Sequence, residues 1–490
     1  MPRVPAQRRS WLERGTATLG SVSLRTRDIV VRPAALQARP MRRRPRGANN
    51  VRPDVRVAVM LAAAAVGGVV LLGLFWADTQ GLSFATSGEA FTTTGDALGM
   101  LAAYLLMVQV LMMARVPWLE RGIGSDRLAA AHRRMGEWVV IVLIAHVGTI
   151  VVGYANGVAK AVPGEVVTLL MHTAYVGLAA VGTGFFLLIG LISLRAIRRR
   201  LPYELWYYIH LSVYVSLALA FAHQIVLGPT FSGNATARWA WGAAYVATGL
   251  AVIVFRIGGP LRLAYRHGLY VTAVKPEGPD TVSIYLGGRN LRRLGAQPGQ
   301  FFRWRFLARG SWWQTHPFSL SAAPNREWLR VTVGALGNHS RALQNVKPGT
   351  RVLAEGPYGA FTAALRTRRK VLLLAGGIGI TPLRALADAL TSTATDIVLI
   401  YRASDMGEVV FAQELEWMQR NGRLTVHYLL GKRDAMPRPL SAERLKYLVP
   451  DVADRDVFLC GPPGMVEAAR LALRRAGVNR RRLHHERFAF

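Results

Sequence analysis

Cysteine is almost absent from this chain of 490 residues, since Cys460 is the single example. One thiol cannot form a disulfide within its own chain. An iron–sulfur cluster held by cysteine needs several thiolates, so this class of redox centre is excluded as well.

Acidic residues are also scarce, because 28 Asp and Glu stand against 61 Lys and Arg, a formal net charge of +33. Such an excess can indicate nucleic-acid binding. Here the basic residues spread through the second half and gather between apolar segments, as the positive-inside rule predicts for a membrane protein. We therefore expect no nucleic-acid partner. The sequence also lacks an EF-hand loop, so it gives no sign of calcium control.

Apolar runs are plentiful, and 51% of the residues are hydrophobic. Six segments are each near the length that crosses a bilayer, namely 57–76, 97–114, 138–154, 166–193, 205–227 and 239–255. Their connections alternate between basic and weakly charged, which predicts cytoplasmic termini and a cytoplasmic second half. We predict a six-helix, lipid-embedded domain over residues 55–258, and we expect the plasma membrane as its location.

Residues 1–54 are rich in Arg and Pro and show no hydrophobic periodicity. This composition predicts a disordered basic cytoplasmic tail that can touch anionic lipid. No apolar core follows Met1, so we expect no cleaved signal peptide. Met41 precedes a run of arginines and is an alternative start residue.

Two of the apolar segments carry two histidines each. His132 and His146 are 14 residues apart, roughly 21 Å along a helix, and their rings leave nearly the same face. His210 and His223 are similarly placed on a later segment. Histidines are costly in a bilayer and mark functional paths there. Two helices with histidines at two matching depths therefore predict two stacked haems.

The predicted topology pairs these histidines by depth, His132 with His210 for an inner haem and His146 with His223 for an outer haem. The spacing of 13 in the second segment leaves its two rings about 140° apart on a straight helix. An overwound turn or different approach angles must absorb this mismatch. The alternative is that all four are packing or interfacial histidines. His172 has no partner at its depth and is a candidate for the acceptor site or a proton relay.

The second half of the chain has ordinary soluble composition. Short alternating strands punctuated by Gly and Pro predict an antiparallel β-barrel over residues 266–365. From about residue 370 strands and helices alternate, which predicts a doubly wound parallel sheet over residues 368–490. The expected fold is thus an α-helical six-span membrane bundle, followed by an antiparallel β-barrel domain and an α/β doubly wound domain.

His316, Pro317, Phe318 and Ser319 form a motif that resembles the flavin-binding motif of the ferredoxin–NADP reductase superfamily. The His-Pro-Phe form is the one used by ferric reductases and NADPH oxidases. The resemblance implies that His316 lies near the phosphates or ribityl chain of FAD, that Phe318 packs on the isoalloxazine, and that Ser319 hydrogen-bonds near the flavin N5. The alternative is an ordinary strand with a core phenylalanine. Gly337 to Ser340 resembles the pyrophosphate-binding loop of the same superfamily.

A glycine-rich turn follows a predicted strand and opens a predicted helix, where backbone N–H groups can approach a pyrophosphate. It resembles the nicotinamide-dinucleotide loop of the same superfamily, and its candidate binding residues are Gly376, Gly377, Gly379, Thr381 and Pro382. Arg402 ends the next strand, where ribose recognition is expected, and favours the 2′-phosphate of NADPH over NADH. A surface arginine is the alternative there.

Cys460 and Gly461 resemble the loop that places a cysteine near the nicotinamide C4, although a small buried residue ending a strand would look the same. Near the end of the chain, Glu486 and Phe488 resemble the superfamily's Glu-x-aromatic ending that covers the flavin. Phe490 is the second choice for the stacking ring. On this resemblance Ser319, Cys460, Glu486 and Phe488 are the candidate catalytic residues.

The resemblance covers roughly residues 55–490 and is to the ferric reductase and NADPH oxidase-like membrane flavocytochromes b. It implies electron transfer from cytosolic NADPH or NADH through FAD and two b-type haems to an external acceptor.

The residues leave the acceptor open. NADPH oxidases carry a further histidine one turn past the outer ligand, where this chain has Ile150, so reduction of a ferric or other metal chelate is favoured. Reduction of O2 to superoxide is the alternative. An alternative of another class is a membrane-anchored reductase that passes electrons to a soluble cytosolic partner, and a haem sensor without enzyme activity is less favoured still.

Overall fold

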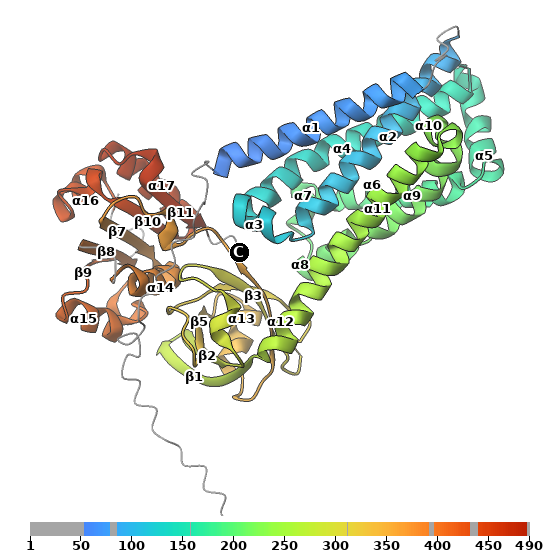
Figure 1. Ribbon diagram of the computed structural model, residues 1–490. Coiled ribbons are helices and arrows are strands. Elements are labelled where there is room, and N and C mark those ends of the chain that lie inside the picture. The colour runs from blue at the N-terminus through green and yellow to red at the C-terminus, as the bar shows by residue number, and fades with distance from the viewer. Residues whose placement is uncertain are drawn as a thin grey trace, which may run out of the picture. The chain divides into compact units, whose positions relative to one another are not determined.

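The computed structural model describes residues 53–78, 86–156, 158–310, 312–391, 396–431 and 440–487 (Figure 1). The predicted tail lies outside the described residues, except that Pro53 and Asp54 begin the first helix. The choice between Met1 and Met41 as the start residue also lies outside them.

Six helical stretches in the described residues are long and apolar enough to cross a membrane, namely Val55–Ala77, Ser87–Met113, Arg127–Tyr154, Val176–Ser193, Leu205–Leu227 and Ala235–His267. Each overlaps one predicted segment, so the six predicted spans are confirmed. Large apolar side chains such as Val69, Leu188 and Val246 are exposed on them by 69%, 42% and 61%. Exposed apolar surface of this extent is expected where lipid rather than water surrounds the helices.

The helices of this domain are α1 (Pro53–Asp78), α2 (Ser87–Met113), α3 (Pro117–Ile123), α4 (Ser125–Tyr154), α5 (Val162–His172), α6 (Val176–Ser193), α7 (Arg195–Arg198), α8 (Tyr203–His210), α9 (Val213–Leu227), α10 (Pro229–Gly233), α11 (Ala235–Ala251), the π-helical η3 (Val252–Gly258) and α12 (Gly259–His267). Helix α2 begins with a capping box, in which Thr86 accepts a hydrogen bond from the Glu89 backbone N–H at 3.2 Å.

Two of the predicted spans are interrupted. The expectation of one helix over 166–193 is wrong, because Tyr175 has φ of +63° and separates α5 from α6. An L-residue in this region cannot continue a right-handed helix. The fifth span breaks between α8, which ends at His210, and α9, which carries His223. The azimuth of a straight helix therefore does not apply to these two histidines, and how their rings approach the haems stays a prediction.

The next part of the chain contains two three-stranded antiparallel sheets. One has the order β1 (Tyr270–Gly278), β2 (Thr281–Gly287), β5 (Leu329–Gly334), and the other β4 (His316–Ser319), β3 (Phe301–Phe306), β6 (Val352–Tyr358). Fully buried rings of Phe302, Trp304 and Phe306 lie in the core of this domain. Isolated bridges join Tyr270 to Arg351 and Leu320 to Val331. The antiparallel β domain is thus confirmed, and its closure into a barrel stays a prediction.

The last part is an α/β domain with a five-stranded parallel sheet. Its order is β11 (Leu483–Arg487), β10 (Asp456–Gly461), β7 (Lys370–Gly376), β8 (Asp396–Ala403), β9 (Thr425–Leu430). Apolar side chains of β7 and β8 pack on both faces of the sheet, as expected of strands buried on both sides. Helices α14 (Ile380–Leu390) and α15 (Ala412–Arg420) cover one face, and α16 (Ala442–Leu448) and α17 (Pro463–Arg475) the other (Figure 1).

Asp456, the first residue of β10, ties this sheet to the chain segment that enters it. Its carboxylate is fully buried and accepts hydrogen bonds from the backbone N–H groups of Thr367 (2.6 Å) and Arg368. His484 Nε2 lies 3.6 Å from the same carboxylate. Burial disfavours the charged carboxylate and by itself would raise the pKa of Asp456. His484 and the two backbone donors outweigh this effect and hold the pKa below its usual value of 3.8.

We expect Asp456→Asn to destabilise the protein at pH 7 by about 1–3 kcal/mol, the usual effect on a buried, hydrogen-bonded group. Because the folded pKa is lowered, the charge stabilises the fold above pH 3.8, and this stabilisation is lost as the pH falls through the folded pKa. Thermal unfolding of both proteins between pH 7 and pH 3 measures it. The two melting temperatures should converge at low pH, while Asp454→Asn, at a side chain 80% exposed, should match the wild type throughout. A gap that does not change with pH would contradict the prediction.

Candidate functional site

His132 on α4 and His210 at the end of α8 lie opposite each other. Their ring centroids are 6.0 Å apart, with 68° between the ring planes. A bond from a metal to an imidazole nitrogen is about 2 Å long, so two imidazoles on opposite sides of one metal have centroids about 6 Å apart. Nδ1 of each ring is buried without a hydrogen-bond partner in the described part of the chain. The pair therefore fits the axial ligands of one haem.

Two side chains that the sequence analysis did not single out adjoin this pair. Trp206 stacks on His210 with centroids 5.0 Å apart, and the Gln109 side chain donates to the carbonyl of His132 at 3.1 Å. Gln109 is 5% exposed in the apolar second half of α2. A buried amide in a membrane span was the available sequence signal, because polar groups there are costly without a partner.

Arg256 was assigned by sequence to a basic connection, but it lies within the π-helical η3. Its Nη1 donates to the carbonyl of Met113 at 3.1 Å, and its Nη2 donates to the hydroxyl of Tyr207 at 2.8 Å. Tyr207 is one turn before His210 on α8, and the charge of Arg256 acts on both His132 and His210. π-helical turns frequently occur at functional sites. The irregular helix thus brings a cation to the inner histidine pair.

The other two predicted ligands, His146 and His223, interact electrostatically, and their pairing stays a prediction. Nδ1 of His146 lies 2.8 Å from the carbonyl oxygen of Gly95 on α2, a contact that orients the ring and leaves Nε2 for a metal. Gly99 gives the ring room, because a Cβ there would lie 2.7 Å from His146 Cε1. Nδ1 of His223 is buried without a partner among the described residues. The residues present fit a second haem.

His172 joins neither pair. It is the last residue of α5, and its side chain is exposed. Its predicted part in an acceptor site or proton relay stays a prediction.

The flavin motif coincides with β4. Ser319 is its last residue, and its hydroxyl is buried without a hydrogen-bond partner in the part of the chain that the structure describes. A flavin nitrogen would satisfy it. Phe318 is half-buried against the core of the β domain, and its ring stacks on His316 with centroids 5.7 Å apart and planes at 13°. Trp304 donates to the Phe318 carbonyl at 2.9 Å and holds the strand in place. Pro317 is exposed.

The loop that resembles a pyrophosphate site precedes the short helix α13 (Asn338–Ala342). The backbone N–H of Gly337 donates to the hydroxyl of Ser340 at 3.0 Å, and that hydroxyl donates to the Gly337 carbonyl at 3.0 Å. The Gly337 backbone and the Ser340 hydroxyl therefore bond to each other within the loop. Phosphate binding there stays a prediction.

The glycine-rich turn lies between the carboxyl ends of β7 and β10. The strand order reverses at β7, and ligands of open α/β sheets bind at such a switch point. Gly376 ends β7, Gly377 has φ of +51°, and a Cβ on Gly379 would overlap the carbonyl oxygen of Cys460. The backbones approach so closely that only glycine fits at Gly379. The turn thus packs closely against the end of β10, and dinucleotide binding there stays a prediction.

Buried groups hold this turn in position. Thr381 and Pro382 are buried in the first turn of α14, and the Thr381 hydroxyl donates to the Ile378 carbonyl at 3.0 Å. The hydroxyl of Tyr401 donates to the Gly377 carbonyl at 3.2 Å. Burial raises the pKa of Tyr401, so its proton stays available for this bond. Tyr401 is fully buried and supports the turn.

Arg402 pairs with Gly376 across β8 and β7, so it lies beside the glycine-rich turn. Its Nη1 donates to the carbonyls of Ala403 and, at 3.0 Å, Leu429. Recognition of a 2′-phosphate by this side chain stays a prediction.

Cys460 on β10 pairs with Ala375 on β7 and with Glu486 on β11. The carboxyl ends of these three strands therefore lie side by side in the sheet. Burial, and then the charge of Glu486, raise the pKa of the Cys460 thiol well above 9.0, so it is a neutral thiol at pH 7. Gly461 ends β10 and is also buried. The predicted stacking residues Phe488 and Phe490 lie outside the described residues.

Arg115 connects the loop after α2 to the β domain. It forms an ion pair with Glu355 and donates to the hydroxyl of Tyr358 at 3.0 Å, both on β6. The Arg115 and Glu355 side chains are only 12% and 17% exposed. The loop between α2 and α3 therefore contacts the β domain.

Three stretches of the chain match described families. Residues 98–221 match "Ferric reductase like transmembrane component", residues 269–362 match "FAD-binding domain", and residues 373–471 match "Oxidoreductase NAD-binding domain". The matched stretches contain three of the four candidate haem ligands, the flavin motif and the glycine-rich turn, while His223 lies just beyond the first of them.

Similar proteins include an NADPH oxidoreductase of Mycobacterium tuberculosis, 30% identical over 45% of this chain and 59% of the relative. The ferredoxin reductase component of a 3-ketosteroid-9-alpha-monooxygenase from Mycolicibacterium smegmatis is 36% identical over 40% and 56%. The chain spans about half the length of such relatives. The FAD/NAD-binding domain of a nitric oxide dioxygenase from Vibrio cholerae is 26% identical over 45% of this chain and 98% of that chain, with a TM-score of 0.39.

The three family matches follow one another in the order of the six membrane spans, the antiparallel β domain and the parallel α/β domain. The chain is an integral membrane protein, and it belongs to the ferric reductase-like oxidoreductases, in which a transmembrane component is joined to FAD-binding and NAD-binding domains.

Proposed function

We propose that this protein transfers electrons from cytosolic NADPH or NADH, through FAD and two b-type haems, to an acceptor outside the membrane. When bound, FAD supplies the conversion of a hydride into single electrons, and the haems supply one-electron carriers. We also propose the domain bounds 55–258, 266–365 and 368–490, and the plasma membrane as location, with the termini and the FAD and NAD(P) domains in the cytoplasm.

The pairing of the four membrane histidines carries this proposal. The ring centroids of His132 and His210 lie 6.0 Å apart, a distance at which both rings would hold one haem iron, and His146 on α4 interacts electrostatically with His223 on α9. An anchor without electron transfer would need no such pairs. Buried imidazoles in a membrane are costly, so they indicate a function rather than packing.

The FAD-binding and NAD-binding domains contain the residues that we propose bind FAD and NAD(P)H. The buried hydroxyl of Ser319 is available to a flavin nitrogen, and the turn at Gly376–Gly379 is shaped for a dinucleotide pyrophosphate. Cys460, a neutral thiol beside that turn, is proposed to border the nicotinamide. Arg402 supports NADPH as the preferred donor.

For the acceptor, we favour a ferric or other metal chelate. Ile150, one turn after His146, packs its side chain near Gly95 of α2, so an apolar group occupies the position where a further histidine would assist oxygen reduction. Superoxide production is the runner-up. Several relatives are reductase components of monooxygenases, which supports a second class, a reductase serving a soluble cytosolic partner.

Sealed vesicles containing the full-length protein distinguish these functions. NADPH is added outside, and an impermeant ferric chelate is trapped inside. We expect a b-type haem spectrum and reduction of the trapped chelate that superoxide dismutase does not inhibit. Inhibition by the dismutase would favour superoxide production. Haem binding without reduction of the trapped chelate would favour the anchored reductase, and a purified protein without b-type haem would contradict the proposal.

A further inference from the structure

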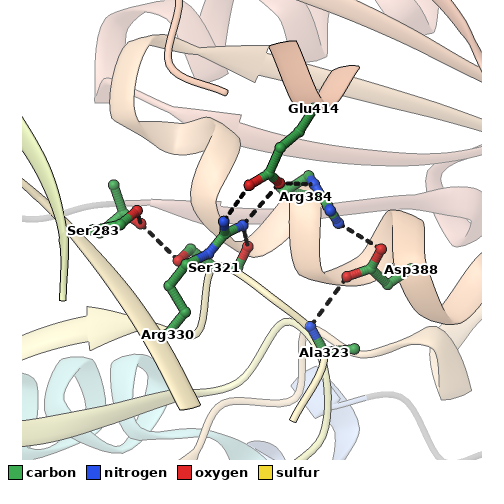
Figure 2. A network of polar contacts seen from close by, with 8 residues as sticks. Ser283, Ser321, Ala323, Arg330, Arg384, Asp388 and Glu414 are labelled. Carbon is green, nitrogen blue, oxygen red and sulfur yellow. Dashed lines mark hydrogen bonds and ion pairs between the residues drawn. The ribbon is translucent and has the colours of Figure 1, made fainter. Parts of the chain in front are cut away.

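A network of charges, buried except for the Glu414 side chain at 33% exposure, joins the segment after the flavin motif to the helix that begins at the glycine-rich turn. It consists of Arg330 on β5, Arg384 and Asp388 on α14, and Glu414 on α15 (Figure 2). Two cations and two anions thus meet between the FAD-binding and NAD-binding domains. None of the family motifs includes these residues.

Glu414 is the centre of the network. Both of its carboxylate oxygens accept from Arg330, Oε1 from Nη1 and Oε2 from Nη2 at 3.1 Å. Oε2 also accepts from Nε of Arg384 at 2.8 Å. One carboxylate therefore holds two guanidinium groups that come from different domains, and a bidentate pair of this kind fixes direction as well as distance.

The network ends on the backbone next to the flavin motif. Arg330 Nη2 donates to the carbonyl of Ser321 at 2.8 Å, two residues after Ser319. Asp388, in an ion pair with Arg384 at 2.5 Å, accepts from the backbone N–H of Ala323 at 3.3 Å. The strand that presents the Ser319 hydroxyl is thereby held against α14.

The same helix carries the other half of the proposed hydride-transfer site. Arg384 is three residues after Thr381, one turn from the glycine-rich turn at the start of α14. Because one turn of an α-helix is rigid, a displacement of Arg384 would also displace the glycine-rich turn. Charge contacts thus lie within a few residues of both proposed cofactor sites.

The arrangement is costly, which argues against a purely stabilising role. The side chains of Arg330, Arg384 and Asp388 are 3%, 7% and 8% exposed, and apolar residues often stabilise such positions equally well. Phe411 has φ of +63°, an unfavourable conformation for a bulky residue, and its ring lies 4.5 Å from the Arg330 guanidinium. Burial would raise the pKa of Glu414, but Arg330 and Arg384 lower it, so the carboxylate stays charged at neutral pH.

We propose, building on the proposed transfer of a hydride from NAD(P)H to FAD, that Glu414 is a positioning residue that sets the distance between the nicotinamide and the flavin. Hydride transfer needs reacting atoms about 3–3.5 Å apart, and a displacement of about 1 Å can slow such a step about 100-fold. Two domains joined by an ordinary interface move relative to each other. The shared carboxylate restricts that motion.

The test is anaerobic stopped-flow reduction of bound FAD by NADPH in the full-length protein, with rates expressed per bound FAD. We expect Glu414→Gln to slow flavin reduction at saturating NADPH about 10- to 100-fold, with little change in the apparent affinity for NADPH and in FAD content. The primary isotope effect with deuterated NADPH should rise, which a stabilising role alone would not cause. The matched control is Glu416→Gln, two residues along α15, where the side chain is 63% exposed and pairs only with Arg420 among the described residues.

Glu414→Gln leaves two buried guanidinium groups with a weaker acceptor, so a second variant guards against misfolding. Arg330→Met with Glu414→Leu removes the pair while keeping apolar volume. Slow flavin reduction with normal FAD content in either variant supports the proposal. A rate within twofold of the wild type overturns it, as does failure of both variants to bind FAD, which would make the network a folding element. A wild-type protein that NADPH and NADH both fail to reduce would instead contradict the proposed function.

Discussion

Replacing His146 with alanine is expected to remove the outer haem and to stop electron transfer across the membrane. The bound b-type haem should fall by roughly half, because His146 and His223 are proposed as the two ligands of one iron. Reduction of a trapped ferric chelate should fall at least about 100-fold, since a gap of roughly 21 Å then separates the inner pair from the depth of the outer one. Haem content per FAD and the reduced-minus-oxidised spectrum measure the first effect, and sealed vesicles measure the second.

His172→Ala is the matched control for this change. His172 lies on the neighbouring α5 with an exposed side chain and joins neither pair. Its replacement should leave both haems in place. Flavin reduction by NADPH should be normal in both variants, because that step takes place in the other two domains. A two-haem spectrum that survives His146→Ala would contradict the ligand assignment.

The second large effect is expected for Gly379→Ala. An added Cβ would overlap the carbonyl oxygen of Cys460, which is backbone and cannot swing away. Either the glycine-rich turn or the end of β10 must move, and both border the proposed nicotinamide site. We expect kcat/KM for NADPH to fall at least about 100-fold, as displacements of about 1 Å do in positioned reactions. Initial rates of acceptor reduction over a range of NADPH concentrations measure it, and FAD content should stay normal.

Gly407→Ala is the control for an added methyl group in the same domain. The nearest atom to a Cβ there is Asp405 Oδ1 at 3.1 Å, on a side chain that can adjust. Reduction by dithionite should give identical flavin and haem spectra in both variants. Equal kcat/KM values for Gly379→Ala and wild type would show that the turn does not bind the dinucleotide.

Local sequence patterns were sufficient to predict which segments form helices and which form strands. Apolar runs of membrane length predicted all six spans, because lipid selects long apolar helices whatever their neighbours are. Continuous apolar runs followed by glycine likewise predicted β7 and the turn after it. Such features depend on a few consecutive residues, so they are readable without a fold.

Helix interruptions were predicted less well. The break at Tyr175 and the break after His210 contain neither proline nor glycine, so no helix-breaking residue in the local sequence predicted them. Both depend on how neighbouring helices pack. The spacing of His210 and His223 was noticed as irregular, but only the structure supplied the reason.

The sequence by itself determined the domain order, the four histidines, the flavin motif and the glycine-rich turn, since each is a short pattern with its own chemistry. The predicted topology already paired His132 with His210, but tertiary structure alone decided that their ring centroids lie 6.0 Å apart and that Arg256 turns toward them. It also brought Arg330 to Glu414, 84 positions apart in the chain. Contacts of that separation leave no local periodicity, because they arise only when distant segments pack together.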